Sequence, residues 1–146
     1  MGIRRNISHW YDGWVYDNLI AWHQRYIFDV AVDLMGACGN VLDVACGTGE
    51  FAMQKSEKCN RIVGLDLSER NIVTARKNAD EKNLTNVEFI HANAAKLEDV
   101  IDEKFDYAII SYAIHEMPRG IRQDVLKQML SVADKVIIAD YASPQP

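Results

Sequence analysis

Short apolar segments alternate with amphipathic stretches along the chain from residue 41 onward. Five apolar segments have the length of buried or half-buried strands, and they cover residues 41–45, 61–66, 87–90, 105–111 and 136–139. Helical patterns lie between them, over residues 50–58, after the N-cap candidate Ser68 and around Val125. Strands that alternate with helices build βαβ units with right-handed crossovers, so we expect an α/β fold whose parallel sheet is covered on both faces.

Residues 8–36 precede this alternation and are rich in aromatic side chains. Apolar residues recur there at helical spacing, and Gly36 is a suitable residue to end a helix. The stretch therefore predicts one helix ahead of the sheet. Two of its aromatic residues, Trp22 and Tyr26, are expected to pack in the core.

The composition excludes several classes of function. Of the 146 residues, 49% are hydrophobic and 25% are charged, which suits one globular domain. The formal net charge is −5, and an acidic chain is a poor general nucleic-acid binder because duplex affinity depends on Lys and Arg. The sequence has no apolar run of about 18 residues or more, so we expect no membrane span.

The cysteines indicate whether the chain carries disulfides and whether its compartment is reducing. Cys38, Cys46 and Cys59 are odd in number and form no C-x-x-C pair. This pattern disfavours a disulfide framework and a structural zinc site, and it favours a reducing compartment. The N-terminal residues do not have the pattern of a secretion signal. We therefore expect a cytoplasmic protein.

The strongest local signal is the loop after the first strand, in the sequence DVACGTGEFA that begins at Asp43. Its glycines, Gly47 and Gly49, let the backbone turn sharply and approach a ligand closely. Three interpretations fit: a turn without a ligand, a dinucleotide site supported by Asp66, 17 residues beyond Gly49, or a site for S-adenosylmethionine. Asp43 separates the last two, because a carboxylate repels a pyrophosphate and attracts the ammonium and sulfonium groups of S-adenosylmethionine.

From this loop onward the chain resembles the class I S-adenosylmethionine-dependent methyltransferases, in particular the type found in ubiquinone and menaquinone biosynthesis. The first motif is DVACGTG, in which Ala45 replaces a commoner glycine. The resemblance continues in VGLDLS around Asp66, in FIHANA around Asn93 and in FDYAIISYAIHEMP from Phe105, so four motifs occur in the expected order. It implies a doubly wound, Rossmann-like parallel sheet of strand order 3-2-1-4-5.

The resemblance also assigns contacts to the cofactor, S-adenosylmethionine, whose product is S-adenosylhomocysteine. By similarity, Asp66 accepts hydrogen bonds from the ribose hydroxyls, Leu67 packs on the adenine, and Asn93 stands where an Asp usually accepts from the adenine amino group. A helical lid of residues 1–38 is implied over a cofactor-binding core of residues 39–146. Further contacts are implied for Tyr11, Trp14, Asp43, Ala45, Cys46, Gly47, Gly49, Ala94, Ser111 and Tyr112.

A general base is needed only where the methyl acceptor must lose a proton. Four candidates follow the fourth and fifth strands, and they are His115, Glu116, Asp140 and Tyr141. His115 is the first choice because imidazole titrates near neutral pH. In the alternative interpretation, His115 and Glu116 only close the loop before the next helix. No second pair at ligand spacing accompanies them, so we expect no metal site.

The fifth strand is the last expected element, whereas the related enzymes continue with a helix and an antiparallel pair of strands. We therefore expect either a truncated piece of a longer protein or a homodimer that covers the edge of the fifth strand. The favoured function is methyl transfer from S-adenosylmethionine to a small-molecule acceptor. The alternatives are a non-catalytic S-adenosylmethionine-binding module and, less favoured because of Asp43, an NAD-dependent oxidoreductase.

Overall fold

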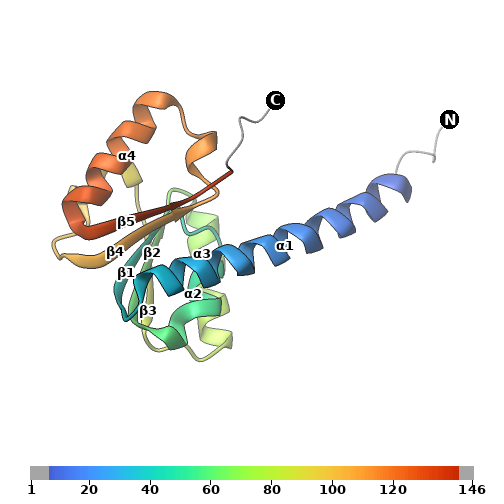
Figure 1. Ribbon diagram of the computed structural model, residues 1–146, viewed down its shortest axis with the longest axis horizontal. Coiled ribbons are helices and arrows are strands. Elements are labelled where there is room, and N and C mark those ends of the chain that lie inside the picture. The colour runs from blue at the N-terminus through green and yellow to red at the C-terminus, as the bar shows by residue number, and fades with distance from the viewer. Residues whose placement is uncertain (1–6, 142–146) are drawn as a thin grey trace.

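The structure is a computed structural model that describes the backbone of residues 7–141 and the side chains of residues 21–141. The chain forms four helices and five strands in this part, and strands alternate with helices from the first strand onward except between the third and fourth strands, which are joined through the 3-10 segment Ala94–Asp99 (Figure 1). The elements are α1 (Ile7–Met35), β1 (Cys38–Val44), α2 (Glu50–Lys55), β2 (Cys59–Asp66), α3 (Glu69–Glu81), β3 (Val87–His91), β4 (Phe105–Ser111), α4 (Arg119–Val132) and β5 (Ala133–Ala139). Every strand and helix expected from the sequence is present, which confirms the α/β prediction.

The five strands form one sheet in the order β3-β2-β1-β4-β5. All four neighbouring pairs are parallel, so the predicted doubly wound order is confirmed. The order reverses direction at β1, since the chain first builds outward through β2 and β3 and then returns to the other side with β4. Ligands of such sheets lie beyond the carboxyl ends of the strands at this reversal, which here falls between β1 and β4.

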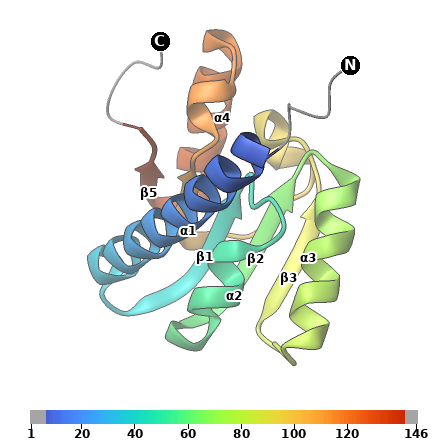
Figure 2. The same ribbon diagram turned by 90° about the vertical axis from the view of Figure 1, so that its right-hand side faces the viewer.

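Two hydrophobic clusters cover the two faces of the sheet. One contains buried side chains of α1, α2 and α3, and the other contains those of α4 and of the 3-10 segment Ala94–Asp99. Figure 2 shows α1, α2 and α3 together on one face, with α4 behind the sheet. In β1 the side chains alternate between the faces, because Val41 packs in the first cluster and Leu42 and Val44 pack in the second.

Helix α3 follows the sequence closely. The Ser68 side chain accepts a hydrogen bond from the backbone N–H of Asn71 and caps the helix, as predicted. Ile72, Ala75 and Ala79 are its buried residues, which is the apolar face expected from their spacing.

The buried face of α1 differs from the prediction. Phe28, Ala31 and Met35 are almost fully buried, and the rings of Phe28 and Phe51 meet edge to face with centroids 5.3 Å apart. Trp22 and Tyr26 are 64% and 56% exposed, so the prediction that they pack in the core was wrong. The reason is the helical period, because these two rings lie on the side of α1 opposite to Phe28 and Met35.

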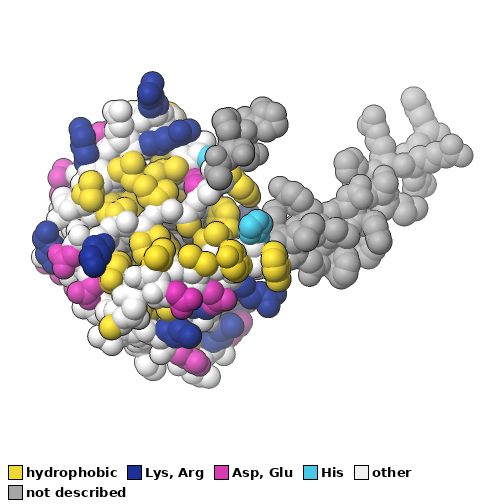
Figure 3. Space-filling view, viewed as in Figure 1, with side chains coloured by type: hydrophobic (Ala, Val, Ile, Leu, Met, Phe, Trp, Pro, Cys, Tyr) yellow, Lys and Arg dark blue, Asp and Glu magenta, His cyan; other side chains and the backbone are white. Residues whose placement is uncertain are grey.

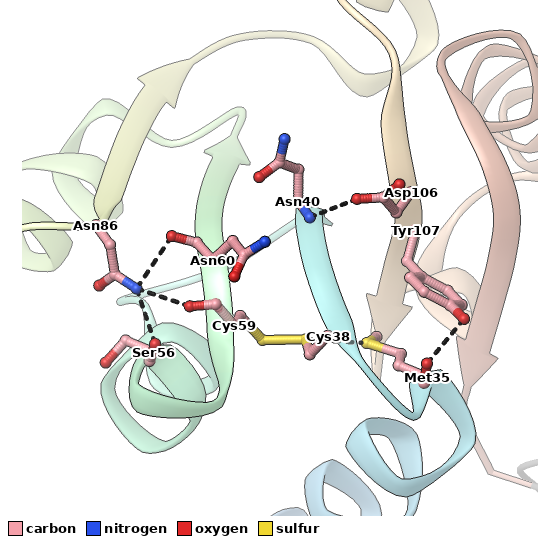
Figure 4. The surroundings of a disulfide bond; sticks show 9 residues. All are labelled: Met35, Cys38, Asn40, Ser56, Cys59, Asn60, Asn86, Asp106 and Tyr107. Atoms are coloured by element: carbon pink, nitrogen blue, oxygen red, sulfur yellow. Dashed lines mark hydrogen bonds between the residues drawn. A yellow bond between two sulfur atoms is a disulfide. The ribbon is translucent and has the colours of Figure 1, made fainter.

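The prediction of no disulfide was also wrong. Cys38 and Cys59 form a disulfide with Cα atoms 4.5 Å apart (Figure 4). They are partners in the parallel register of β1 and β2, so the strand pairing itself brings the two side chains together. Disulfides persist in oxidising compartments, so the cysteine pattern no longer supports the expected reducing environment.

The outer edge of β5 has no strand partner within residues 7–141. Ile138 on this strand is 50% exposed, and Val30 and Leu34 of α1 are 37% and 70% exposed. Figure 3 shows hydrophobic side chains spread over the face of the molecule that carries β5 and α1. The expected homodimer through this edge stays a prediction. No helix in the described part of the chain is long and apolar enough to cross a bilayer.

Candidate functional site

The loop after β1 turns through left-handed backbone conformations. Ala45, Gly47 and Gly49 have φ values of 56°, 58° and 86°. At Gly49 a Cβ atom would lie 2.9 Å from Cζ of Phe89, so both the conformation and the space require glycine there. The Cys46 N–H donates to the Leu65 carbonyl at 2.9 Å, which holds the loop against the end of β2.

Asp66, at the end of β2, ties this loop to the next one. Its Oδ2 accepts a hydrogen bond from the Gly47 N–H at 2.9 Å, and its Oδ1 accepts from the Ser68 N–H at 2.9 Å. The side-chain amide of Asn71 also donates to Oδ1, at 3.3 Å. A carboxylate offers about four acceptor positions and three of them are used here, so Asp66 retains about one, on Oδ2, for a hydroxyl group of a ligand.

Two cavities meet at the carboxyl ends of β1 and β4. The larger has a volume of about 550 Å³ and the smaller one of about 230 Å³. Ala45 and Ser111 line both cavities, so a ligand that passes between these two residues occupies both. The larger cavity includes Asp66, Leu67, Asn93, Ala94 and Tyr112 in its wall, and the smaller one includes Asp43, Cys46 and Gly47.

Asp43 is the most unusual polar group of the site. Its side chain is 2% exposed, and its Oδ1 has no hydrogen-bond partner in the described part of the chain. Burial, together with the nearby charge of Asp66, raises the pKa of the Asp43 carboxyl to about 8. An unpaired buried acid costs stability unless a donor or a cation reaches it. A ligand with an ammonium group in the smaller cavity meets that need, whereas a phosphate does not.

Cys46 lies beside Asp43 in the smaller cavity. Burial and the charges of Asp43 and Asp66 raise the pKa of its thiol. The thiol therefore stays protonated and unreactive, so its role at this site is in the packing and the backbone of the loop.

The far end of the larger cavity is formed by the segments after β2 and β3. Leu67 is 69% exposed and free to cover a flat ring. His91 is hydrogen-bonded through Nε2 to the Leu67 carbonyl at 2.9 Å and holds this segment in place. The side-chain oxygen Oδ1 of Asn93 accepts from the Ala95 N–H at 2.9 Å, so part of the acceptor capacity expected to serve a ligand caps the following turn.

At the end of β4, Tyr112 has a positive φ of 55°. Its N–H donates to the Ala139 carbonyl of β5 at 2.8 Å. Burial, with the charges of Tyr141 and Asp140, raises the pKa of the Tyr112 phenol, which therefore stays neutral. The rings of Tyr112 and Tyr141 have centroids 5.5 Å apart and form one wall beyond the sheet.

His115 does not line either cavity, but the residues on both sides of it do, since Ala113 and Glu116 border the larger one. Its Nδ1 lies 2.6 Å from Oδ1 of Asp140, and its backbone N–H donates to Oδ2 of the same carboxylate at 2.9 Å. The side chain of His115 is 27% exposed and that of Asp140 is 10% exposed. The sequence indicated both residues as candidate bases, but it did not indicate that they pair.

The structure gathers most of the residues proposed from the sequence around the two cavities. Gly49 lines neither cavity and acts through the shape of the loop. The side chains of Tyr11 and Trp14 lie outside the described residues. Sequence reasoning missed Gln24 of α1, which borders the smaller cavity, and Asn71, which borders the larger one. Nothing local marks Gln24, because only the packing of α1 brings it to the site.

The fold and the site together define a doubly wound domain with an acidic, ligand-sized pocket at the reversal of its strand order. The family model described as a methyltransferase domain matches residues 41–135, which run from within β1 to the first residues of β5. The chain belongs to this methyltransferase domain family. The resemblance stated from the sequence motifs is thereby confirmed.

Individual relatives agree with this family. A demethylmenaquinone methyltransferase from Listeria welshimeri serovar 6b is 36% identical over 96 residues, which are 64% of this chain and 39% of that protein. The chain thus spans well under half the length of this curated relative. Among solved structures, the PH0226 protein from Pyrococcus horikoshii OT3 is 33% identical with a TM-score of 0.67, over 75% of this chain and 49% of that one.

A further structural match concerns the fold alone. Magnesium protoporphyrin IX methyltransferase from Synechocystis PCC 6803, solved with bound S-adenosylmethionine, has a TM-score of 0.70 at 20% identity. The match covers 82% of this chain and 59% of that one.

Proposed function

We propose that this chain binds S-adenosylmethionine and transfers its methyl group to a small, apolar acceptor. The observation that carries the proposal is the buried, unpartnered carboxyl of Asp43, which lies at the smaller cavity next to the larger one. The ligand chemistry that fits combines a cation at one end and a hydroxylated nucleoside at the other. S-adenosylmethionine has both.

Each cavity binds a different part of S-adenosylmethionine. Asp43 and the 45–49 loop receive the amino-acid end, where the ammonium group satisfies the orphaned carboxylate oxygen. Asp66 accepts from a ribose hydroxyl with its remaining acceptor position, and Leu67 covers the adenine. The sulfonium then falls between Ala45 and Ser111, where the two cavities join.

Once bound, S-adenosylmethionine supplies a methyl group on a leaving group that needs no further activation. The protein then has to align the acceptor with the methyl group and exclude water, which can contribute about 7–11 kcal/mol to lowering the barrier. Ser111, the last residue of β4, and Tyr112, which follows it, both line the larger cavity and are the residues that we expect to contribute to this alignment.

The wall of the larger cavity supports an apolar acceptor. Beyond the nucleoside end, this wall is formed by Met117, Pro118, Ile121 and Val125. An aromatic or quinone-like ring buries apolar area against these side chains, worth about 25 cal/mol per Å². The name of the Listeria relative, a demethylmenaquinone methyltransferase, is consistent with such an acceptor.

Calorimetric titration of the full chain tests the cofactor. We expect S-adenosylmethionine and S-adenosylhomocysteine to bind with micromolar affinity, about −8 kcal/mol, and NAD not to bind. The Asp66→Ala variant loses this binding, whereas Asp102→Ala, an exposed carboxylate far from the loop in sequence, keeps it. Tight binding of NAD would overturn the proposal.

Transfer of a radiolabelled methyl group to a panel of phenols and quinols then tests turnover. Label in the organic product supports the enzyme. Cofactor binding without transfer to any acceptor would instead favour the non-catalytic binding module.

A further inference from the structure

We propose that His115 is the general base of the methyl transfer, that Asp140 is the residue that positions it, and that the acceptor therefore reacts through an acidic hydroxyl. This inference rests on the proposed function and narrows its substrate to phenols and quinols. It depends on one juxtaposition: a histidine and a nearly buried carboxylate paired at the carboxyl edge of the sheet, beside the cavity wall.

The strand register brings the two residues together. β4 and β5 are parallel, and Ser111 is the register partner of Ala139. Asp140 directly follows Ala139, and the 3-10 turn Ile114–Glu116 brings His115 back over the same strand ends. Both residues therefore belong to the edge at which the cavities open, and not to the helices that cover the sheet.

Asp140 holds the histidine by two contacts. One carboxylate oxygen pairs with Nδ1 of His115 at 2.6 Å, and the other accepts from the backbone N–H of His115 at 2.9 Å. The Tyr141 N–H donates to Oδ1 of Asp140 at 2.8 Å and fixes the carboxylate in turn. Because an ionised carboxylate only accepts hydrogen bonds, the proton of a neutral His115 belongs on Nδ1. The lone pair of Nε2 is then available to remove a proton.

Nε2 of His115 makes no hydrogen bond in the described part of the chain, and its one ion-pair partner there is Glu116. The ring of Tyr141 meets the imidazole edge to face, with centroids 5.1 Å apart, and Tyr112 lies beyond it. Oε1 of Glu116 is 3.7 Å from Nε2, on a side chain that is 77% exposed. From α4, Arg122 donates to the backbone carbonyl of His115 at 3.0 Å and so braces the turn without touching the ring. These residues and Asp140 are the titratable groups that face His115 in the described structure.

The proposed step conserves atoms and charge. Nε2 of His115 takes the hydroxyl proton with its lone pair, and the electron pair of the O–H bond stays on the acceptor oxygen. That oxygen forms the new bond to the methyl carbon as the carbon–sulfur bond breaks, with its electron pair returning to sulfur. The imidazolium is stabilised by the Asp140 carboxylate until it releases the proton to water. For a carbon acceptor on the same ring, the hydroxyl is ionised in the same way and the charge is delocalised to the carbon that takes the methyl group. That carbon then loses its hydrogen as a proton to water, and the oxygen regains a proton from the imidazolium.

The first test observes the ring directly and requires no turnover. Nitrogen-15 NMR of the histidine side chains, on the full chain with bound S-adenosylhomocysteine, should show His115 as the Nδ1-protonated tautomer. The signal is assigned by its loss in His115→Gln. In Asp140→Asn the amide can donate to Nδ1, and we expect the opposite tautomer to gain population. An Nε2-protonated His115 in the wild type would overturn the proposal.

The second test is kinetic and uses a reduced naphthoquinone under anaerobic conditions as acceptor. His115→Gln should lower kcat by about 10²–10⁴-fold while the affinity for S-adenosylhomocysteine stays unchanged. The methyl-transfer rate of the wild type should fall on acidification, and His115→Gln should lack this dependence. At high pH the rate of the variant should rise toward that of the wild type, because the hydroxyl of the acceptor ionises there without a base. His23→Gln, an exposed histidine on α1, is the matched control and should behave as the wild type.

The outcomes separate this inference from the proposed function. If S-adenosylhomocysteine does not bind the wild type, the proposed function fails. If it binds and methyl transfer is equally fast in His115→Gln, only the assignment of the base fails. If it binds and methyl transfer reaches amines or thiols but no phenol or quinol, the proposed acceptor class is wrong.

Discussion

The carboxylate of Asp66 accepts a hydrogen bond at 2.9 Å from the backbone N–H of Gly47, nineteen residues before it in the chain. One side chain at the end of β2 thereby fixes the loop that follows β1. The same carboxylate also accepts from the Ser68 N–H at the start of α3. A residue expected from sequence to serve only the ligand thus shapes the pocket before any ligand arrives.

This double role predicts a loss of stability in Asp66→Asn. An amide has one acceptor oxygen, so it cannot accept from both Gly47 and Ser68 through separate oxygens, and one partly buried donor is left without its partner. We expect the free energy of unfolding to fall by about 1–3 kcal/mol. Urea denaturation measures this, with Asp102→Asn as an exposed control. Equal stability of both variants would show that the loop does not depend on Asp66.

Asp43→Asn should have the opposite effect on the ligand-free protein. The pKa of Asp43 is about 8 in the folded chain, against an ordinary value near 3.8. Between those values the folded state binds a proton that the unfolded state does not, so stability falls as the pH rises from about 4 to about 8. The variant lacks this titration, and we expect it to be more stable than the wild type by about 1–3 kcal/mol at pH 8.

Thermal unfolding across this pH range measures the difference between the two proteins. The wild type should lose stability relative to Asp43→Asn as the pH rises. Parallel pH profiles for the two proteins would contradict the raised pKa of Asp43.

The same carboxyl makes ligand binding depend on pH. To pair with an ammonium group, Asp43 must release the proton that it holds below about pH 8. Binding of S-adenosylmethionine should therefore release close to one proton at pH 6.5, and affinity should rise about tenfold per pH unit until the titration is complete. Calorimetry in buffers of different ionisation enthalpy counts the proton. Asp43→Asn, which has no proton to release, should bind weakly and without this dependence.

The strands, and the end of the sheet at which the cavities lie, were predictable from strong periodic signals and a general rule for parallel sheets, whereas the strand order was predicted from the family resemblance. Buried parallel strands are short, continuous apolar runs, and the ligand of such a sheet lies at the strand ends, where Asp66 and Ser111 were found. The helix α3 was equally clear, since Ser68 caps it and its apolar residues lie on one face.

The contacts that depend on packing were not predictable. In α1 both sides carry apolar residues, so the pattern could not show that Phe28 is buried and Trp22 exposed. Gln24 reaches the smaller cavity only because of how α1 docks. The pairing of His115 with Asp140 depends on a turn and a strand register that no local motif encodes.

The disulfide between Cys38 and Cys59 gives the last prediction. It joins the first residues of β1 and β2, which lie at the end of the sheet opposite the cavities. Closing a chain segment of 21 residues restricts the unfolded state, so the Cys38→Ser, Cys59→Ser double variant should be less stable by about 3 kcal/mol. Neither cysteine lines either cavity, so the double variant should bind S-adenosylhomocysteine as tightly as the wild type does. The affinity is measured about 20 °C below the thermal unfolding midpoint of the variant, so that the variant is folded, and Asp102→Ala sets the difference expected from a neutral substitution. Chemical denaturation with and without reductant measures the first effect and calorimetry the second. A double variant as stable as the oxidised wild type would show that the bond does not contribute to the fold, and a large loss of affinity would show that the paired strand starts shape the distant site.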